Sequence, residues 1–194
     1  DTIKNIQNVI GGAGNDTITG SSSSNTLIGG AGADKFVMRG ELSDTVYGGS
    51  ITFNADGTIN NASHIDANTQ DIIDYSSYTN KAIINLRLGT AQVDLKTDTF
   101  YGIDNAIGTS QADTIYGGAG VNTIFAGAGA DTIYSGSGAD TIYGQDGDDY
   151  IYMQSVENAA SNFVDGGTGF DTVDYTGLAE RIVVNMQGVT EVQV

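Results

Sequence analysis

A nine-residue repeat constrains the fold of this chain more than any other feature of its sequence. Five consecutive units run from Gly108 to Tyr152, reading GTSQADTIY, GGAGVNTIF, AGAGADTIY, SGSGADTIY and GQDGDDYIY. Each unit has a six-residue turn with Asp or Asn in sixth place, followed by three strand-forming residues around a central isoleucine. Because a unit this short buries its apolar face only against its neighbours, the fixed period predicts a stacked repeat fold.

The period also predicts which residues stack on one another. Three residues of strand cover about 10 Å, so the chain must turn after each strand, and glycine supplies the positive φ angles that tight turns need. Alternation along a strand sends the central isoleucine inward and its two neighbours outward. Two units, 18 residues, then complete one coil. This spacing places Asp113, Asp131 and Asp149 in one column, and Asn122 and Asp140 in the opposite column.

The repeat unit closely resembles G-G-x-G-x-D-x-U-x, the nonapeptide of the RTX (repeats-in-toxin) family. The resemblance implies an all-β fold, a parallel β-roll (β-solenoid), that binds several Ca²⁺ ions between successive turns of a column. Ca²⁺ accepts six to eight oxygen ligands, backbone carbonyls included, and carboxylates stacked about 4.8 Å apart would otherwise repel one another. A solvated acidic loop is the plain alternative, but the 18-residue register favours metal columns.

The resemblance assigns two kinds of calcium ligand. The expected carboxylates are Asp16, Asp34, Asp113, Asp131, Asp140, Asp149 and Asp171. The expected backbone carbonyl donors are those of Gly11, Ala13, Gly29, Ala31, Gly117, Ala119, Ala126 and Ala128. The turn Gly108–Asp113 is a poorer match, because Thr109 and Gln111 stand where glycine is usual.

The chain contains two copies of one module, because residues 1–20 reappear at 98–117 with a constant offset of 97. The first module, 1–97, is predicted to hold repeats at 11–37, an insert at 51–70 and a strand tail at 71–97. The second module, 98–194, is predicted to hold repeats at 108–152 and a strand tail at 171–194.

The segments between the repeats carry strand signals of their own. Asp56-Gly57 inside the insert predicts a β-hairpin connector. Alternating apolar residues in Ala82–Leu88 and Ala91–Leu95 predict two half-buried strands. A strand with Ile3, Ile6 and Ile10 is expected to lead into the first coil.

The charge of the chain selects among partners. Acidic residues outnumber basic ones 24 to 7, and residues 98–194 carry 14 acids and a single base, Arg181. Such a segment repels itself without counter-ions, so calcium ions are expected partners, whereas nucleic acid is not. No membrane insertion is expected, since no signal peptide or long apolar span is visible. The absence of cysteine excludes disulfides and thiolate metal sites.

No catalytic site is expected. The sequence has no HExxH, no GxSxG and only one histidine, His64, which lies in a polar loop. The predicted function is that of a structural, calcium-binding β-roll module in a large secreted bacterial surface protein, an S-layer subunit or an adhesin, which leaves the cell by type I secretion and folds outside it. The alternative is a non-catalytic folding and secretion module of an RTX exoenzyme such as a protease, lipase or alginate epimerase.

Outward aromatic residues recur at the ninth position of the repeat. They form two predicted columns, Tyr116, Tyr134 and Tyr152 on one face and Phe125 and Tyr143 on the other. Cross-strand stacking of aromatic rings stabilises a sheet by roughly 0.2–1 kcal/mol per pair. The columns could also contact neighbouring subunits, modules or surface glycan.

Overall fold

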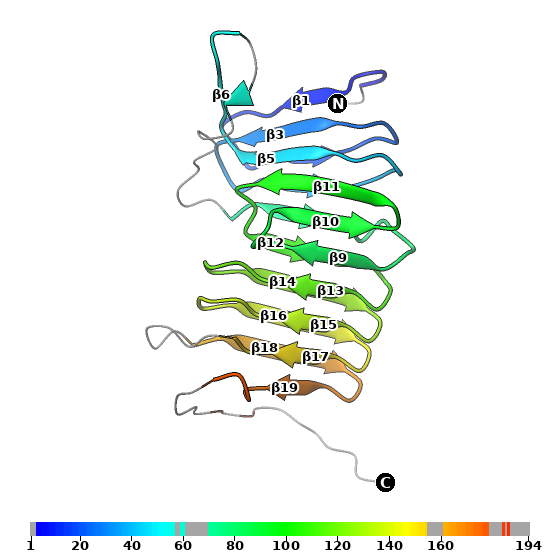
Figure 1. Ribbon diagram of the computed structural model, residues 1–194, viewed down its shortest axis with the longest axis vertical. Coiled ribbons are helices and arrows are strands. Elements are labelled where there is room, and N and C mark those ends of the chain that lie inside the picture. Colours follow the sequence, from blue (N-terminus) through cyan, green and yellow to red (C-terminus); the bar gives the residue numbers. More distant parts are fainter. Residues whose placement is uncertain are drawn as a thin grey trace.

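The computed structural model describes residues 3–56, 59–60, 70–154, 161–178, 184 and 186 of the chain. These residues form strands and turns without any helix, so none of them lies in a helix that could cross a membrane. A ten-stranded and a seven-stranded sheet run along the long axis, stacked from the N-terminal to the C-terminal end (Figure 1). The predicted all-β, parallel β-roll fold is confirmed.

The chain alternates between the two sheets as it winds. The ten-stranded sheet contains, in spatial order, β1 (Asn8–Ile10), β3 (Thr26–Gly30), β5 (Thr45–Gly49), β11 (Lys96–Tyr101), β10 (Thr90–Val93), β9 (Ala82–Asn85), β13 (Thr114–Tyr116), β15 (Thr132–Tyr134), β17 (Tyr150–Tyr152) and β19 (Thr172–Asp174). The seven-stranded sheet contains β18 (Phe163–Thr168), β16 (Thr141–Asp146), β14 (Thr123–Ala128), β12 (Asn105–Ile107), β8 (Ile72–Asp74), β4 (Lys35–Val37) and β2 (Thr17–Thr19).

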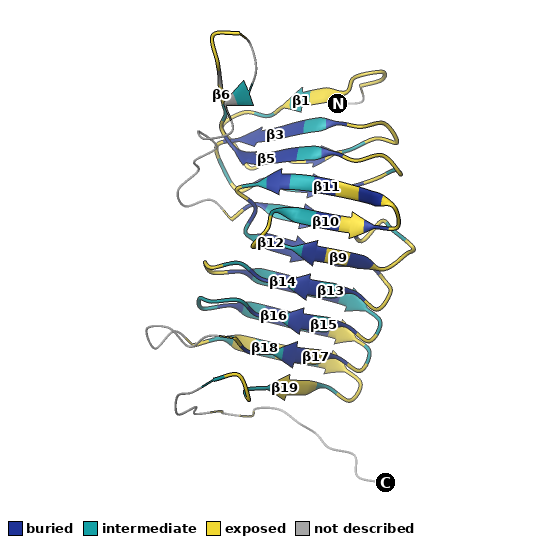
Figure 2. Ribbon diagram, in the orientation of Figure 1, coloured by how far each residue is buried: buried dark blue, intermediate teal, exposed yellow. Residues whose placement is uncertain are grey.

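The core is a file of apolar side chains between the two sheets, and Figure 2 shows the buried positions concentrated in the strands. The central isoleucines of the five long repeats are all fully buried, as predicted: Ile115, Ile124, Ile133, Ile142 and Ile151. Parallel pairing aligns Ile115 with Ile133 and Ile133 with Ile151, an 18-residue coil. Burial of each such side chain contributes about 1.5–3 kcal/mol, so the coils stabilise one another along the whole stack.

One antiparallel meander interrupts the parallel winding. Strands β9, β10 and β11 occupy three neighbouring places in the ten-stranded sheet, where one coil would supply a single strand. Its outer strands pair in parallel with the coils on either side, β11 with β5 and β9 with β13. The two strands predicted from the alternation at 82–95 are therefore present, and β11 crosses residues 97 and 98 without a break in pairing.

The predicted hairpin in the insert is also present: β6 (Thr52–Phe53) pairs antiparallel with β7 (Ile59–Asn60). In Figure 1, β6 lies beside the N-terminal end of the stack. The lead-in was predicted less well, because Ile3, Ile6 and Ile10 are more than half exposed and Val9 packs against the core instead. The strand tail predicted for 171–194 lies mostly outside the described residues, although β19 begins it.

The aromatic columns stack as predicted. Tyr134 lies 4.6 Å from Tyr116 and 4.8 Å from Tyr152, centroid to centroid, with nearly parallel rings. Phe125 and Tyr143 stack in the same way at 4.9 Å on the other sheet. The rings follow the strand spacing of about 4.8 Å, so the parallel register itself brings them into contact.

Candidate metal centre

The sixth-position acids stack in columns at the starts of the strands, where each turn enters a sheet. In the C-terminal column (Asp113, Asp131, Asp149 and Asp171), each backbone N–H donates to Oδ1 of the next carboxylate, over 2.6, 2.8 and 3.0 Å in turn. Asp113, Asp131 and Asp149 are almost completely buried. The column predicted from the 18-residue spacing is thus present, and Asp171 extends it by one coil.

Two further columns lie along the seven-stranded sheet. In one of them, the N–H of Asn122 donates to Oδ1 of Asp140 over 3.0 Å, and the N–H of Asp140 to Oδ1 of Asn162 over 2.7 Å. In the N-terminal column (Asp16, Asp34 and Asp71), the corresponding distances are 2.8 and 2.7 Å. The sequence predicted the pairs Asp16–Asp34 and Asn122–Asp140; the structure adds Asp71 and Asn162 to them.

The second carboxylate oxygen distinguishes the C-terminal column from an ordinary hydrogen-bond ladder. Oδ2 of Asp131 and of Asp149 is buried without a hydrogen-bond partner among the described residues, as is Oδ2 of Asp140 in the column of Asn122. Burial and the neighbouring carboxylates of Asp113 and Asp149 raise the pKa of Asp131 to about 7. Burial, with Asp171 and Asp148 nearby, raises the pKa of Asp149 to about 6. A buried, unpaired carboxylate is costly, so a cation bound at these oxygens would stabilise the folded chain.

Carbonyl oxygens converge on the same carboxylates from the neighbouring turn. At Gly144, an added methyl group would collide with both Oδ2 of Asp149 and the carbonyl oxygen of Gly166. Three other first-position glycines face a similar pair of oxygens: at Gly11 Asp16 and Gly29, at Gly29 Asp34 and Gly48, and at Gly108 Asp113 and Ala126. The turn of Asp131 differs, because it begins with Ala126 and so has a side chain there. Glycine leaves room above these turns into which carboxylate and carbonyl oxygens point together.

This donor set fits a calcium ion better than other metals. Within the described residues, no three side chains of His, Cys, Asp or Glu converge on one point, so side chains alone do not form a cage. Ca²⁺ takes hard oxygen ligands and accepts backbone carbonyls together with carboxylates. The pairs of oxygens above the glycines are of this kind, and the unpartnered Oδ2 atoms supply negative charge.

The predicted carbonyl donors fall into two groups in the structure. The carbonyl oxygens of Gly29 and Ala126 approach Asp16 and Asp113, as described above. The others lie in turns of the same columns: Gly11, Ala13, Ala31, Gly117, Ala119 and Ala128. The part of all eight carbonyls as ligands stays a prediction. Second-position carbonyls are used differently, since Gly12 accepts the N–H of Ala31 over 2.9 Å.

The turns have two conformations, which differ in whether the turn itself donates a hydrogen bond to the side chain of its sixth residue. In the two turns of the first coil of each run of repeats, the second-position N–H donates to the side-chain oxygen of the sixth residue: Gly12 to Asp16, Ser21 to Asn25, Thr109 to Asp113 and Gly118 to Asn122. In later turns the second residue has a positive φ, +115° at Gly127 and +77° at Gln145. The poorer match at Thr109 thus coincides with a carboxylate that its own turn already satisfies, with the Thr109 hydroxyl donating a further bond.

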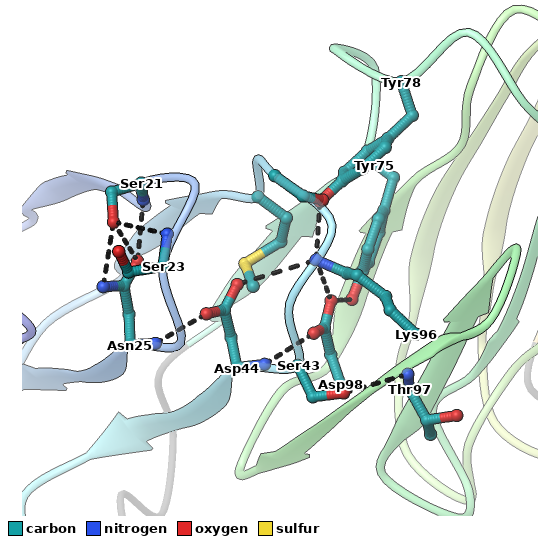
Figure 3. A network of polar contacts seen from close by, with 12 residues as sticks. Ser21, Ser23, Asn25, Ser43, Asp44, Tyr75, Tyr78, Lys96, Thr97 and Asp98 are labelled. Carbon is teal, nitrogen blue, oxygen red and sulfur yellow. Dashed lines mark hydrogen bonds and ion pairs between the residues drawn. The ribbon is translucent and has the colours of Figure 1, made fainter.

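Sequence reasoning missed one polar centre entirely. Asp44 and Asp98 form a junction column with Asn25, in which the N–H of Asn25 donates to Asp44 and that of Asp44 to Asp98. Their Oδ2 atoms face the ammonium of Lys96, at 3.6 and 3.1 Å, and Tyr75 donates its hydroxyl hydrogen to Asp98 over 2.8 Å (Figure 3). The local signal was an Asp immediately before Thr45-Val46-Tyr47, but its partner lies 54 residues away.

The comparisons with known proteins agree with this geometry. A family model described as RTX calcium-binding nonapeptide repeat matches the chain in four copies, over residues 7–36, 98–133 and 126–152. These ranges contain the predicted turns around Asp16, Asp34, Asp113, Asp131 and Asp149, and they leave out Asp44 and Lys96. None of the curated proteins compared with the chain matches it.

Proposed function

Because the chain carries calcium-binding nonapeptide repeats of the RTX family, we propose that it is a structural β-roll module of a large secreted bacterial surface protein, an S-layer subunit or an adhesin. The module folds on calcium outside the cell and performs no catalysis. The observation that carries the calcium dependence is the C-terminal column, where the buried Oδ2 atoms of Asp131 and Asp149 have no hydrogen-bond partner in the part of the chain that the structure describes.

The acids of the columns are the proposed ligands, and each has a defined task. Oδ1 of Asp131 and of Asp149 holds consecutive turns in register by accepting a backbone N–H group, which leaves Oδ2 of these two acids for the cation. The proposed carboxylate ligands are Asp16, Asp34, Asp113, Asp131, Asp140, Asp149 and Asp171. Since such sites are absent from an unfolded chain, the free energy of calcium binding becomes free energy of folding.

A calcium titration tests this function. Circular dichroism in excess chelator should show a largely disordered second module, which gains β-structure as Ca²⁺ is added. Mg²⁺ should substitute poorly, because it requires a smaller, near-ideal octahedral shell. The charge supports this expectation, since residues 98–194 have 14 acids against one base. A β-spectrum that is unchanged by the chelator would contradict the proposal.

The surface role rests on the way the modules join. Pairing runs through β11 from the coils of the first module to those of the second, so that the described strands form an extended stack. Rigid, extended stacks suit proteins that build a lattice or project a binding site. Electron microscopy after calcium addition should show ordered sheets for a lattice subunit, whereas an adhesin should bind glycan or receptor as a monomer. If the protein forms no sheets and binds no glycan or receptor, but improves the refolding of a linked exoenzyme domain, it is better described as a folding and secretion module.

A further inference from the structure

The ammonium of Lys96 lies inside the junction column, surrounded by oxygen atoms. It contacts Oδ2 of Asp98 at 3.1 Å, Oδ2 of Asp44 at 3.6 Å and the hydroxyl oxygen of Tyr78 at 2.6 Å. Figure 3 shows these side chains pointing toward one another from separate segments of the chain. Lys96 is only 5% exposed, which is unusual for lysine, since charged side chains are rarely buried without a partner. We call Asp44, Tyr75, Tyr78, Lys96 and Asp98 the junction centre.

Asp44 and Asp98 are related to each other as the acids of the C-terminal column are. The N–H of Asp44 donates to Oδ1 of Asp98 over 2.8 Å, the same bond and distance as from Asp131 to Asp149. Thr45 and Thr99, the residues that follow them, are register partners in the parallel pair β5–β11. The two acids are therefore consecutive members of one column, and Oδ1 has the same role in both places.

The two columns differ in what their Oδ2 atoms face. Among the described residues, Oδ2 of Asp131 and of Asp149 has no hydrogen-bond partner. In the junction centre the Lys96 ammonium lies 3.1 Å from Oδ2 of Asp98 and forms a longer ion pair, at 3.6 Å, with Oδ2 of Asp44, which likewise has no hydrogen-bond partner. Burial lowers the pKa of Lys96, but the Tyr78 hydroxyl and the Asp98 carboxylate outweigh it and raise the pKa overall, so the ammonium keeps its proton.

The meander explains how a lysine reaches this place. Lys96 precedes Asp98 by two residues in β11, and Lys96, Asp98 and Phe100 all point to the buried side of that strand. In the regular turns the residue two before the acid is a glycine, Gly129 before Asp131 and Gly147 before Asp149. In β11 an extended strand takes the place of such a turn. The position two before the acid therefore holds Lys96 in place of a glycine, and its ammonium points inward.

We propose that the Lys96 ammonium takes the place of a calcium ion between Asp44 and Asp98, so that this coil is held together without metal. The inference rests on the proposed function, because it compares Lys96 with calcium sites in the other columns. It implies that the junction centre is a latent metal site that opens when the lysine charge is removed. Lys96 also lines a cavity of about 500 Å³ with Glu41, Tyr78 and Asp94.

Calcium counting in a Lys96→Met variant tests this inference. Methionine keeps an unbranched, apolar stem of similar length and removes only the ammonium. Isothermal titration and equilibrium dialysis should find one more Ca²⁺ per chain in the variant than in the wild-type protein. Adding Asp44→Asn to Lys96→Met should abolish the extra ion. Lys35→Met is the matched control, because Lys35 pairs at 2.7 Å with Asp74, outside the columns; it should leave the number of ions unchanged.

Hydrogen exchange supplies a readout that does not depend on ion counting. In chelator, β5 and β11 should stay protected in the wild-type protein and lose protection in Lys96→Met, and added Ca²⁺ should restore it. A variant that folds with the wild-type number of ions, or one that Ca²⁺ does not restore, overturns the inference. A wild-type protein that binds no Ca²⁺ at all overturns the proposed function instead, so the two failures are distinguishable.

Discussion

The junction centre and the C-terminal column have the same ladder of backbone N–H to Oδ1 hydrogen bonds, but they differ in the partners of the second carboxylate oxygen, Oδ2. In both, an aspartate N–H donates to Oδ1 of the next aspartate, over 2.8 Å at Asp44 and 2.6 Å at Asp113. The junction centre supplies its own cation, Lys96, and a tyrosine hydroxyl from Tyr75. The C-terminal column supplies neither to its Oδ2 atoms at Asp131 and Asp149. Oδ1 therefore joins consecutive coils in the same way in both places, and the proposed difference in metal dependence lies in the partner of Oδ2.

The overall charge follows the same division. Residues 1–97 have 10 acids and 6 bases, a net charge of −4, whereas residues 98–194 have 14 acids and one base, a net charge of −13. Both lysines that pair with aspartates among the described residues belong to the first module, Lys35 with Asp74 and Lys96 with Asp98. Self-repulsion therefore opposes folding much more strongly in the second module when no cation is bound.

Removal of calcium by a chelator should give the largest difference in stability between the C-terminal column and the junction centre. As Ca²⁺ is withdrawn, the amides of β13, β15 and β17 should lose protection before those of β5 and β11, because only the latter flank a coil that contains its own cation. Hydrogen exchange with mass spectrometry, followed along a calcium-buffer series, measures this order. Earlier loss in β5 and β11 would mean that charge and counter-ions do not control the stability of the coils.

Much of the regular part of this fold could be predicted, because a repeat with a short, fixed period brings residues at a fixed sequence spacing into contact. Once two nonapeptides make one coil, the burial of Ile133 and the stacking of Asp113 on Asp131 follow by counting. The hairpin at β6 and β7 followed from a turn dipeptide in the same way. The ligand role of these acids stays a prediction, since counting places carboxylates but does not bind an ion.

The irregular part could not be predicted, because its contacts join segments with no fixed spacing. Asp34 meets Asp71 across 37 residues that include the insert, and Asp44 meets Asp98 across 54. Lys96 looked like an ordinary polar residue beside a repeat, and only the meander turns it inward. Strands at equivalent sequence positions of the two modules also lie on opposite sheets, β1 on the ten-stranded and β12 on the seven-stranded one, although an offset of 97 aligns their sequences.

Asp131→Asn tests the proposed calcium sites of the C-terminal column at a single residue. Asp131 lies between Asp113 and Asp149, so two proposed calcium sites share its carboxylate, as they share that of Asp149 one coil further on. Loss of one charge at about 4 Å costs about 1–4 kcal/mol, so calcium affinity should fall by roughly tenfold or more. Without calcium the same variant should be more stable than the wild-type protein, because a raised pKa of about 7 marks a carboxylate whose charge is unfavourable there.

Asp140→Asn is the matched control for that variant. Its neighbours in the column are already amides, Asn122 and Asn162, so the substitution should disturb at most one weak site. Titration calorimetry and urea denaturation, each with and without Ca²⁺, compare the two variants. If Asp131→Asn leaves the number of ions and their affinity unchanged, the stacked-column account of calcium binding is wrong. A plain surface-charge account predicts the same small stabilisation for both variants, with and without calcium.

Acidification of calcium-depleted protein should give the smallest effect, and its sign follows from the pKa shifts. The folded-state pKa values of Asp131 and Asp149, about 7 and about 6, lie above the unfolded value of 3.8. The folded chain therefore binds protons that the unfolded chain does not, so its stability rises as the pH falls from about 7 toward about 4 and is lost again as the pH rises. The C-terminal column contributes two such groups with these values, whereas the junction centre contributes Asp44, at about 6.

Calcium should reverse the sign of this pH dependence, because protons then compete with the cation for the same carboxylates. Urea denaturation of calcium-depleted and calcium-loaded protein, at several values between about pH 7 and about pH 5, measures both slopes. Asp131→Asn removes the group with the highest of these pKa values, so the acid-induced gain of the depleted protein should shrink in that variant and persist in Lys35→Met. If the calcium-depleted protein loses stability on acidification, its folded carboxylates are already paired, and the column needs no metal ion to stabilise their charge.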